Sequence, residues 1–550
     1  MRRRGVALVL VVAALLSGCA GIPTSGEVNA GDVEVDDSTG VVALPEGPQA
    51  GATPRAIVEG FMLAGSAGLS GDFSVARQFL AGEAAQSWDP SAGTTVASQT
   101  TLSQSGDSQF TASLDVIGKV DKAGRFAEAA DARESVTFDL VEVDGEWRIS
   151  EPPTGLVVSE RVFQQQYRAA PLYFVTLDGA ELVPDVRYYP VRNLATSVIQ
   201  GLLAGPSPWL QDAVTTAVPD GIELKPEVVT IGSDGTAQVV LQPAATVIAA
   251  PDRGLLLAQI TRSLDLPGIR AVSVRAGVDG TLLDGERAFT DTDVQVPVML
   301  SGDSLVQLAD GALTPVPGVA SLAGLGVRAP AVDLAGDVRV ALSGTGTLVR
   351  LPTSGSDAVV LVSGDVLAAP SVDRFDWVWT ARESQGDGLL AVGPQGQVVQ
   401  LAADWLAGRT VTALRVSRDG TRVAVVSAGS SGTSVDVAGI VRDKSGAPAS
   451  IGVSIQVGAS LTAADQVVWI DASTLVVLGH VAGAAVLSRV PVTGPTETLP
   501  TVSDAVSVAA DVGERTLLVA TSEGDLRRYD GRTWVEVAGA TQVSDPAYPG

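Results

Sequence analysis

The sequence predicts a multidomain protein in which an α+β domain and an α/β domain precede an all-β propeller of about six blades. Apolar residues recur at helical spacing in the first half of the chain. From about Leu305 onward this spacing disappears, and short β runs alternate with Gly, Asp and Ser turns. The 550 residues, 46% of them hydrophobic, suffice for several cores. We therefore expect domains at residues 51–155, 170–298 and 300–550.

The N-terminus has the pattern of an export signal. Arg2, Arg3 and Arg4 precede an apolar run at residues 6–16, which at about 11 residues is too short to span a bilayer. The run ends in Leu16-Ser17-Gly18-Cys19, which resembles the lipobox of bacterial lipoproteins. The resemblance implies that residues 1–18 are a signal peptide cut between Gly18 and Cys19. Cys19 would then carry an S-diacylglycerol and an N-acyl group. The alternative is an ordinary secretory signal in which Cys19 has no role.

A lipid on Cys19 would hold the protein at the extracytoplasmic face of the cell membrane. Each buried methylene contributes roughly 0.8 kcal/mol, and two or more acyl chains give durable attachment. Cys19 is the only cysteine, so disulfides within the chain are impossible. Residues 19–50 are polar, acidic and rich in Gly and Pro, which predicts a flexible tether.

The charge balance argues against a nucleic-acid partner. The chain has 36 basic and 62 acidic residues, a formal net charge of −26. Nucleic-acid binding requires a basic patch or stripe, and none is visible in the sequence. Beyond residue 16 there is also no apolar run of the 18 or more residues that a spanning helix needs.

The N-terminal domain is expected to begin with two helices, because apolar residues recur there at helical spacing. These positions are Ile57, Val58, Phe61 and Met62 in the first helix and Phe73, Ala76, Phe79 and Leu80 in the second. Alternation at residues 110–120 and 134–149 then predicts antiparallel strands, with a hairpin turn at Asp144-Gly145. Helices followed by a curved sheet that ends in Asp-Gly-x-Trp-Arg, at residues 144–148, resemble the NTF2-like fold.

The second domain is expected to contain a central helix that stops at Gly205-Pro206. Its apolar face consists of Leu194, Ala195, Val198, Ile199, Leu202 and Leu203. A strand pair around Asp234-Gly235, a helix that carries Leu256 and Ile260, and a strand at 268–274 follow. This order, with its Leu-Leu-Ala-Gly-Pro stop and the Val-Pro-Asp-Gly-Ile turn at 218–222, resembles the GerMN domain of bacterial envelope and spore-germination lipoproteins. GerMN is usually a binding or assembly module.

The C-terminal part contains a repeat. A β run recurs at intervals of about 40 to 50 residues, the length of one four-stranded propeller blade. The copies lie at residues 339–342, 377–379, 422–426, 475–478 and 516–520. The sharpest copy contains Ser417-Arg418-Asp419-Gly420-Thr421, which resembles the turn of TolB-like propellers. Together with residues 305–316 these copies suggest six blades; the rival architecture is a pair of β-sandwiches.

The sequence offers little for catalysis, and we expect no enzyme activity and no cofactor. The single histidine, His480, follows the β run at 475–478, where a structural turn residue is the simpler interpretation than a catalytic base. There is no P-loop, and Gly344-Thr345-Gly346 lies between β runs, where a tight hairpin explains it better than phosphate binding. With one cysteine and one histidine, most His/Cys metal sites are excluded.

Two further groups have a functional and a structural interpretation. Asp291 and Asp293 would share a strand face, which would suit a calcium site or a glycosidase-like pair, although solvated edge carboxylates are the simpler expectation. Trp377 and Trp379 could line a sugar site, but tryptophans in a blade strand more often pack between blades.

The lipobox, tether, NTF2-like segment, GerMN-like segment and propeller in this order are similar to the LpqB family of actinobacterial lipoproteins. The resemblance implies an accessory of the MtrA-MtrB two-component system. Such a protein contacts the extracytoplasmic part of the MtrB sensor histidine kinase and modulates signalling in envelope homeostasis and cell division. Two alternatives stay open: a wall-glycan or small-ligand binding lipoprotein that uses the propeller face, and a hydrolase of envelope polymers.

Overall fold

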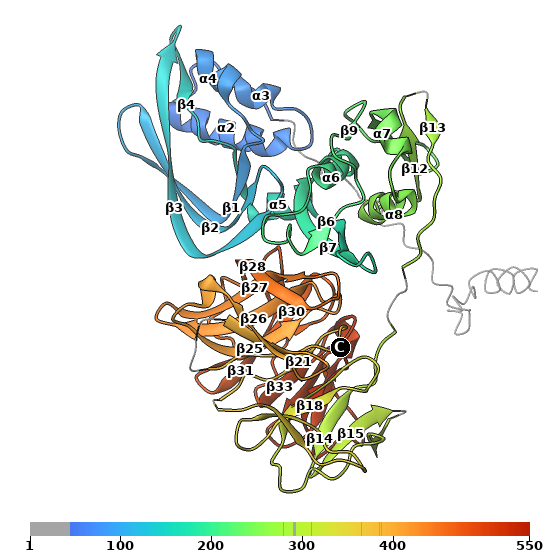
Figure 1. Cartoon of the computed structure of the whole chain (residues 1–550). Helices are drawn as coiled ribbons and strands as arrows, with labels where there is room; N and C mark the ends of the chain where they lie inside the picture. The colour runs from blue at the N-terminus through green and yellow to red at the C-terminus, as the bar shows by residue number, and fades with distance from the viewer. Residues whose placement is uncertain are drawn as a thin grey trace, which may run out of the picture. The chain divides into compact units, whose positions relative to one another are not determined.

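The computed structural model describes residues 45–278, 280–289, 293–309, 311–364, 366–383, 386 and 388–550. Gly18, Cys19 and most of the expected tether lie outside the described residues, as does Asp291. Residues 45–550 form one compact unit. The expected fold classes are confirmed, with two mixed domains followed by a domain of four-stranded sheets (Figure 1).

The N-terminal domain packs helices against one face of a five-stranded sheet (Figure 1). Its elements are α2 (Pro54–Gly68), α3 (Ser74–Arg77), α4 (Gly82–Ser87), β1 (Gly93–Gln104), β2 (Gln109–Asp121), β3 (Phe126–Val143), β4 (Glu146–Glu151) and β5 (Leu156–Ser159). The strand order is β4-β3-β2-β1-β5, and only the pair β1 and β5 is parallel among these described strands. The Asp144-Gly145 turn joins β3 to β4 with positive φ at both residues, as predicted.

Helix α2 begins where the sequence predicts it. Thr53 is the N-cap, with its Oγ1 accepting from the Ala56 N–H at 3.3 Å, and Pro54 occupies the first helical position. The apolar face of α2 is buried in the core of the sheet, where Phe61 meets Trp88 edge to face at 5.1 Å.

The second predicted helix is much shorter than expected. Only residues 74–77 are helical, and Phe79 and Leu80 lie beyond the helix end. The Phe79 carbonyl accepts from the Ile149 N–H at 2.9 Å, and the Ala81 N–H donates to the Ile149 carbonyl at 2.8 Å. Pairing with β4 therefore draws this segment out of the helix that its local pattern favours.

The second domain has two small sheets flanked by helices. Its elements are α5 (Glu160–Gln166), β6 (Tyr167–Thr176), β7 (Leu182–Pro190), α6 (Leu194–Leu203), β8 (Val214–Thr215), β9 (Glu223–Leu224), β10 (Thr230–Ile231), β11 (Thr236–Gln242), α7 (Ala244–Ile248), α8 (Arg253–Ser263), β12 (Ala271–Ala276) and β13 (Thr281–Leu282). One sheet runs β10-β11-β12-β13 with β9 on β11, and the other runs β7-β6-β8. The predicted helix α6 is confirmed, and Gly205 follows it with a φ of +89°.

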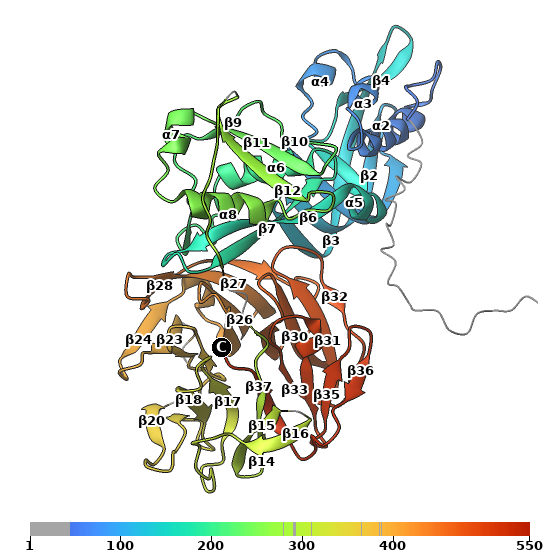
Figure 2. The same ribbon diagram turned by 90° about the vertical axis from the view of Figure 1, so that its right-hand side faces the viewer.

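The described part of the C-terminal domain has six sheets of four antiparallel strands, which surround a common centre in Figure 2. The first is β14 (Val298–Ser301), β15 (Ser304–Ala309), β16 (Ala312–Pro315) and β37 (Ser544–Ala547); the second is β17 (Arg328–Val332), β18 (Arg339–Leu342), β19 (Leu348–Arg350) and β20 (Val359–Val362); the third is β21 (Ser371–Val372), β22 (Val378–Thr380), β23 (Gly388–Val392) and β24 (Val398–Ala402). The fourth is β25 (Thr410–Val416), β26 (Arg422–Gly429), β27 (Gly432–Arg442) and β28 (Pro448–Val457); the fifth is β29 (Gln466–Trp469), β30 (Thr474–Val481), β31 (Ala484–Pro491) and β32 (Glu497–Thr498); the sixth is β33 (Ala505–Ala509), β34 (Leu518–Thr521), β35 (Leu526–Tyr529) and β36 (Trp534–Glu536).

The predicted repeat occupies the same place in five of these sheets. Each copy falls on or overlaps the second strand: β18, β22, β26, β30 and β34. The first sheet is different, because its strand β37 comes from the other end of the domain and pairs with β14. The C-terminus lies at the centre of the sheets in Figure 2. This closed arrangement replaces the alternative of stacked β-sandwiches.

Hydrogen bonds and apolar contacts join the domains to one another. Glu128 of β3 accepts from the Ser460 hydroxyl at 2.9 Å, from the Thr496 N–H at 3.0 Å and from the Thr496 hydroxyl at 2.8 Å. The Tyr188 N–H of β7 donates to the Gly124 carbonyl at 2.6 Å. One hydrophobic cluster combines Trp209, Leu210 and Ala213 of the second domain with Ala424, Val426 and Val437 of the fourth sheet.

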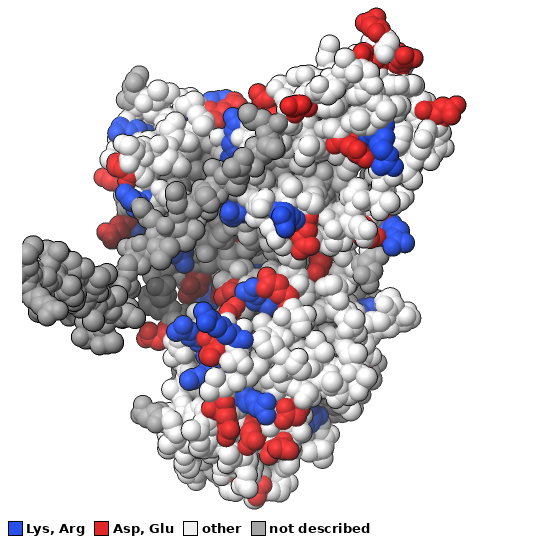
Figure 3. Space-filling model, turned by 180° about the vertical axis from the view of Figure 1, so that it is seen from behind, with Lys and Arg blue, Asp and Glu red and all other residues white. Residues whose placement is uncertain are grey.

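Acidic and basic side chains are interspersed over the face drawn in Figure 3, and no continuous basic stripe crosses its visible described residues. Exposed pairs such as Lys119 with Glu134, at 2.8 Å, join opposite charges. Pairs of this kind contribute about 0–1 kcal/mol each, so they shape the surface potential more than the stability.

Candidate binding site in the propeller channel

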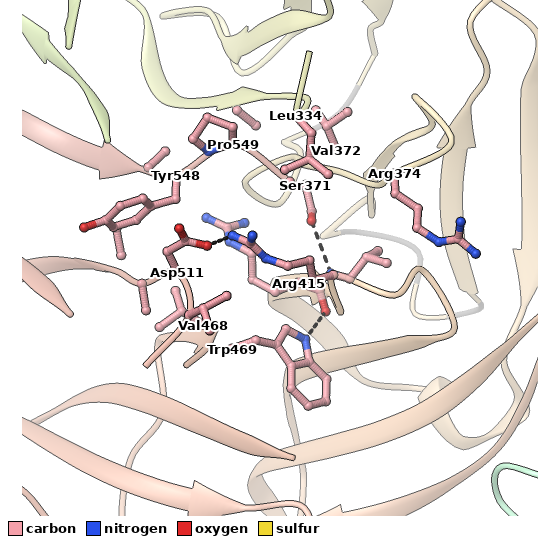
Figure 4. A pocket seen from close by; sticks show the side chains of 18 of the residues that line it. Leu334, Ser371, Val372, Arg374, Arg415, Val468, Trp469, Asp511, Tyr548 and Pro549 are labelled. Carbon is pink, nitrogen blue, oxygen red and sulfur yellow. Dashed lines mark hydrogen bonds and ion pairs between the residues drawn. The ribbon is translucent and has the colours of Figure 1, made fainter. Parts of the chain in front are cut away.

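A channel at the centre of the propeller holds a cavity of about 270 Å³. Its walls come from the strands β17, β21, β25, β29, β33 and β37 and the turns that follow them (Figure 4). The lining residues of the propeller fall within 330–334, 370–374, 415–419, 468–472, 508–512 and 546–550, and the second domain adds Glu181 and Leu182. Many of them are small, for example Ala331, Ser371 and Ala509, and their size leaves the space open.

Arg415 is one of three arginines that line this cavity (Figure 4). Its Nη1 donates to the carbonyls of Pro370 and Leu414, both at 3.0 Å. No carboxylate of the described residues lies within ion-pairing distance of it. Burial lowers the pKa of Arg415 to about 10, so the guanidinium stays charged at neutral pH.

The other charges of the channel are mostly paired. Arg418 forms an ion pair with Asp511, whose second oxygen accepts from the Gln295 N–H at 2.6 Å. Nη1 of Arg418 is buried without a hydrogen-bond partner. Trp469 lies beside these groups and donates its indole N–H to the Arg415 carbonyl at 3.1 Å.

The turn predicted to be the sharpest motif of the propeller forms one rim of the channel. Asp419 Oδ1 accepts from the Ser417 hydroxyl at 2.7 Å and from the Thr421 N–H at 2.8 Å, while Oδ2 pairs with Arg422. Burial opposes the ionisation of Asp419, but Arg422 and the hydrogen bonds outweigh it and hold its pKa below the usual range. Gly420 has a φ of +72°, which a residue with a side chain rarely adopts.

The loop between β6 and β7 of the second domain reaches the same rim. Glu181 and Leu182 line the cavity, and Asp178 accepts from Nη2 of Arg374 at 2.8 Å. Burial raises the pKa of Glu181. The cavity is therefore shared by the propeller and the domain before it.

His480 lies in a structural hydrogen-bond network. It is inside β30 rather than after the strand, which corrects the expected turn position. Nδ1 lies 2.7 Å from Asp465 Oδ2, and Nε2 lies 3.0 Å from the Ala505 carbonyl. Both ring nitrogens are thus engaged, and the hydrogen bond that the ring donates to Asp465 raises the pKa of the imidazole.

The two tryptophans that were candidates for a sugar site are buried. Trp377 and Trp379 belong to a hydrophobic cluster of the third and fourth sheets, and the Trp379 indole N–H donates to Asp373 at 2.7 Å. The structural interpretation is confirmed for both, and a glycan platform built on them is excluded by their burial.

The remaining candidates do not come together as a site. Asp293 lies outside any strand, so the expected strand face shared with Asp291 is not formed by it. Gly344-Thr345-Gly346 is the turn between β18 and β19, as predicted. In the described part of the chain, no group of three or more His, Cys, Asp or Glu side chains could hold a metal ion. Nor does any helix within those ranges have the length and apolarity needed to span a membrane.

Sequence reasoning missed Arg415. The repeat itself contained a signal for Arg415. In each sheet, one position of the first strand lies one residue before the last paired residue. This position is Ala331 in the second sheet, Ser371 in the third and Val468 in the fifth. The fourth sheet has Arg415 at this position. A charge at a repeat position otherwise filled by small or apolar residues marks a special environment.

The fold and the channel define a three-domain propeller protein with a polar internal cavity. Family models match each domain: the Lipoprotein LpqB N-terminal domain at residues 47–164, the Sporulation and spore germination (Germane) domain at 171–284, and the Lipoprotein LpqB beta-propeller domain at 303–549. The chain belongs to the LpqB lipoprotein family.

Relatives named Lipoprotein LpqB match over nearly the whole chain. The protein of Cutibacterium acnes is 27% identical, covering 96% of this chain and 97% of its own length. That of Streptomyces avermitilis is 28% identical, covering 100% and 99%. That of Thermobifida fusca is 28% identical, covering 98% and 97%. Among solved structures, a nidogen/laminin complex matches with a TM-score of 0.31 and 11% identity, over 46% of this chain and 94% of that chain.

Proposed function

We propose that this chain is a non-enzymatic, lipid-anchored binding protein at the extracytoplasmic face of the cell membrane. It contacts the ectodomain of an MtrB-like sensor histidine kinase and modulates two-component signalling in envelope homeostasis and cell division. The observation that carries the proposal is the end-to-end match to LpqB lipoproteins, which includes the segment with Leu16-Ser17-Gly18-Cys19.

The anchor gives a physical reason why a weak interface would suffice. Acyl chains on Cys19 confine the folded domains to a thin layer next to a membrane-embedded kinase, which raises their effective concentration. To regulate the kinase, the protein must bind one kinase state better than another. Contacts between the domains, such as those of Glu128 with Ser460 and Thr496, support a body that presents one composite surface.

The absence of enzyme activity is proposed because the possible catalytic acids and bases already have hydrogen-bond or ion-pair partners. His480 is held by Asp465 and Ala505, and Asp419 and Asp511 are paired with arginines. Catalytic acids and bases need a free position facing a substrate.

The test is affinity capture with the kinase as the readout. Wild-type and Cys19→Ser chains are each used to capture proteins from detergent-solubilised membranes of the source cells. We expect both to enrich the MtrB-like kinase, because the folded domains make the contact. In intact cells, crosslinking should reach the kinase from the wild type far more than from Cys19→Ser, which should fractionate as a soluble protein.

Two results would contradict the proposal. If neither chain enriches the kinase from detergent, the protein is not its binding partner. If Cys19→Ser stays in the membrane fraction, and the wild type takes up no labelled palmitate, the anchor is not a lipid on Cys19.

A further inference from the structure

We propose that the propeller channel binds a small anion, one that carries a carboxylate or phosphate group, with Arg415 as the residue that holds the charge. The site lies in the cavity of about 270 Å³ at the centre of the sheets. This inference goes beyond kinase binding and does not depend on it.

The first step of the argument is the charge of the channel. Its lining includes three arginines, and two of these have a carboxylate partner: Arg374 pairs with Asp178, and Arg418 pairs with Asp511. Arg415 has none among the described residues. A guanidinium without a counter-charge inside a protein is costly, because desolvation is not offset by a Coulomb attraction.

The second step is the geometry of Arg415. Nη1 is used by the carbonyls of Pro370 and Leu414, which hold the side chain in place. Nε and Nη2 make no hydrogen bond with any of the described residues, and yet they are not among the fully buried polar atoms that lack a partner. These two donors therefore have open surface, and the cavity is the space that Arg415 lines (Figure 4). A planar pair of donors of this kind matches the two oxygens of a carboxylate or phosphate.

The third step concerns the carboxylates that face the cavity without an arginine partner. Asp471 is exposed and accepts from the N–H and the hydroxyl of Ser473, at 2.6 and 3.1 Å, so its charge is directed into its own turn. Glu181 lies at the rim contributed by the second domain. Ser371 and Ala331, which line the same cavity as Arg415, are buried and have small side chains, so they leave space in it for a ligand.

The experiment measures binding of three probes to the full chain by isothermal titration calorimetry. Inorganic phosphate and succinate represent the two sources of the anion, and glycerol is the neutral control. We expect one equivalent of at least one anion to bind, with the preference between them identifying the source, and no binding of glycerol. Arg415→Gln should weaken binding by about 10- to 100-fold, the usual effect of losing a charge-assisted hydrogen-bonded pair.

Matched variants separate a binding role from a structural one. Arg415→Lys keeps the positive charge but loses the planar pair of guanidinium donors, so it should retain part of the affinity. Arg527→Gln changes an arginine of β35 that pairs with Asp504 outside the channel, and it should bind like the wild type. The anion should raise the Tm of the wild type and of Arg527→Gln, but not that of Arg415→Gln.

If Arg415→Gln does not fold, a second experiment tests whether the anion protects Arg415 of the wild type from chemical modification. Butanedione modifies accessible arginines, and the anion should slow modification of Arg415, read by peptide mass spectrometry, and leave that of Arg527 unchanged. The proposal is overturned if neither anion binds the wild type at up to about 10 mM. Equal binding by Arg415→Gln, or no protection of Arg415, would overturn it as well.

Discussion

Buried arginines of the propeller reach from one sheet to the turn of another. Arg442 of β27 pairs with Asp373 of the third sheet, and Arg422 of β26 donates to the Ala472 carbonyl of the fifth. Removing one partner of a buried ion pair typically costs about 3–5 kcal/mol, since the other charge stays buried. These residues therefore hold the register between sheets. Arg415 of β25 also reaches across, to the Pro370 carbonyl before β21, but it differs from Arg422 and Arg442 in having no carboxylate partner among the described residues.

The single histidine of the chain, His480, leads to a prediction about how stability depends on pH. The hydrogen bond that its ring donates to Asp465 raises the pKa of His480 above its ordinary value of 6.5. The folded state therefore favours the protonated ring. The stability that this contributes is complete below pH 6.5, the unfolded value, and is lost as the pH rises through the folded pKa.

An NMR titration of the His480 ring protons measures this pKa directly. Asp465→Asn should lower it toward 6.5, whereas Asp471→Asn, which changes an aspartate in its own turn, should leave it unchanged. A wild-type pKa at or below 6.5 would show that the hydrogen bond does not act as described.

At the scale of elements, the propeller depends on a strand from the end of the domain. β37 pairs with β14, and its residues also line the channel. The Gly550 N–H then donates to the Val332 carbonyl of the second sheet at 2.9 Å. The C-terminal segment thus closes the first sheet and ties it to its neighbour.

A chain that ends at residue 543 should be strongly destabilised, because the first sheet loses a strand and β14 loses one of its two partner strands. We expect its Tm to fall by about 10 °C or more, given about 2–4 °C per kcal/mol for a domain of this size. A chain that ends at residue 549 loses one hydrogen bond and is the control. Equal thermal unfolding of the two truncated chains would contradict the closing role of β37.

At the scale of the whole molecule, residues 45–550 behave as one unit because specific contacts cross between domains. Glu128 accepts three hydrogen bonds from propeller residues, and Tyr188 of the second domain packs against Phe126 of β3 with a ring distance of 5.4 Å. Burial raises the pKa of Tyr188 to about 12. The two mixed domains and the propeller with its channel are therefore parts of one compact unit.

The contact between the N-terminal domain and the propeller can be tested at the backbone amide of Thr496. Glu128→Gln weakens the acceptor of the Thr496 N–H, so hydrogen exchange at Thr496 should accelerate by roughly tenfold. Glu134→Gln is the matched control, because Glu134 lies on the same strand and pairs with Lys119 within its own domain. Equal exchange at Thr496 in the two variants would mean that Glu128 does not hold the domains together.

Features with a local period were predictable from the sequence. The helix face of α6 follows from a spacing of 3.6 residues, and the hairpin follows from strand alternation around Asp144-Gly145. The five second strands of the propeller follow from a β run that recurs about every 40 to 50 residues. The prediction of a helix that includes Phe79 and Leu80 was wrong, because backbone hydrogen bonds with Ile149 outweigh a short helical pattern. The lipid site at Cys19 remains a prediction, since it lies outside the described residues.

The sequence by itself determined the order of the domains, the repeat and the family, because each of these is recognised from residues that are close together in the chain. Only the tertiary structure decided that β37 closes the first sheet and that Arg415 faces a cavity without a counter-charge. The physical reason is that the surroundings of Arg415 come from strands far apart in the chain, and the field at a charge depends on all of them.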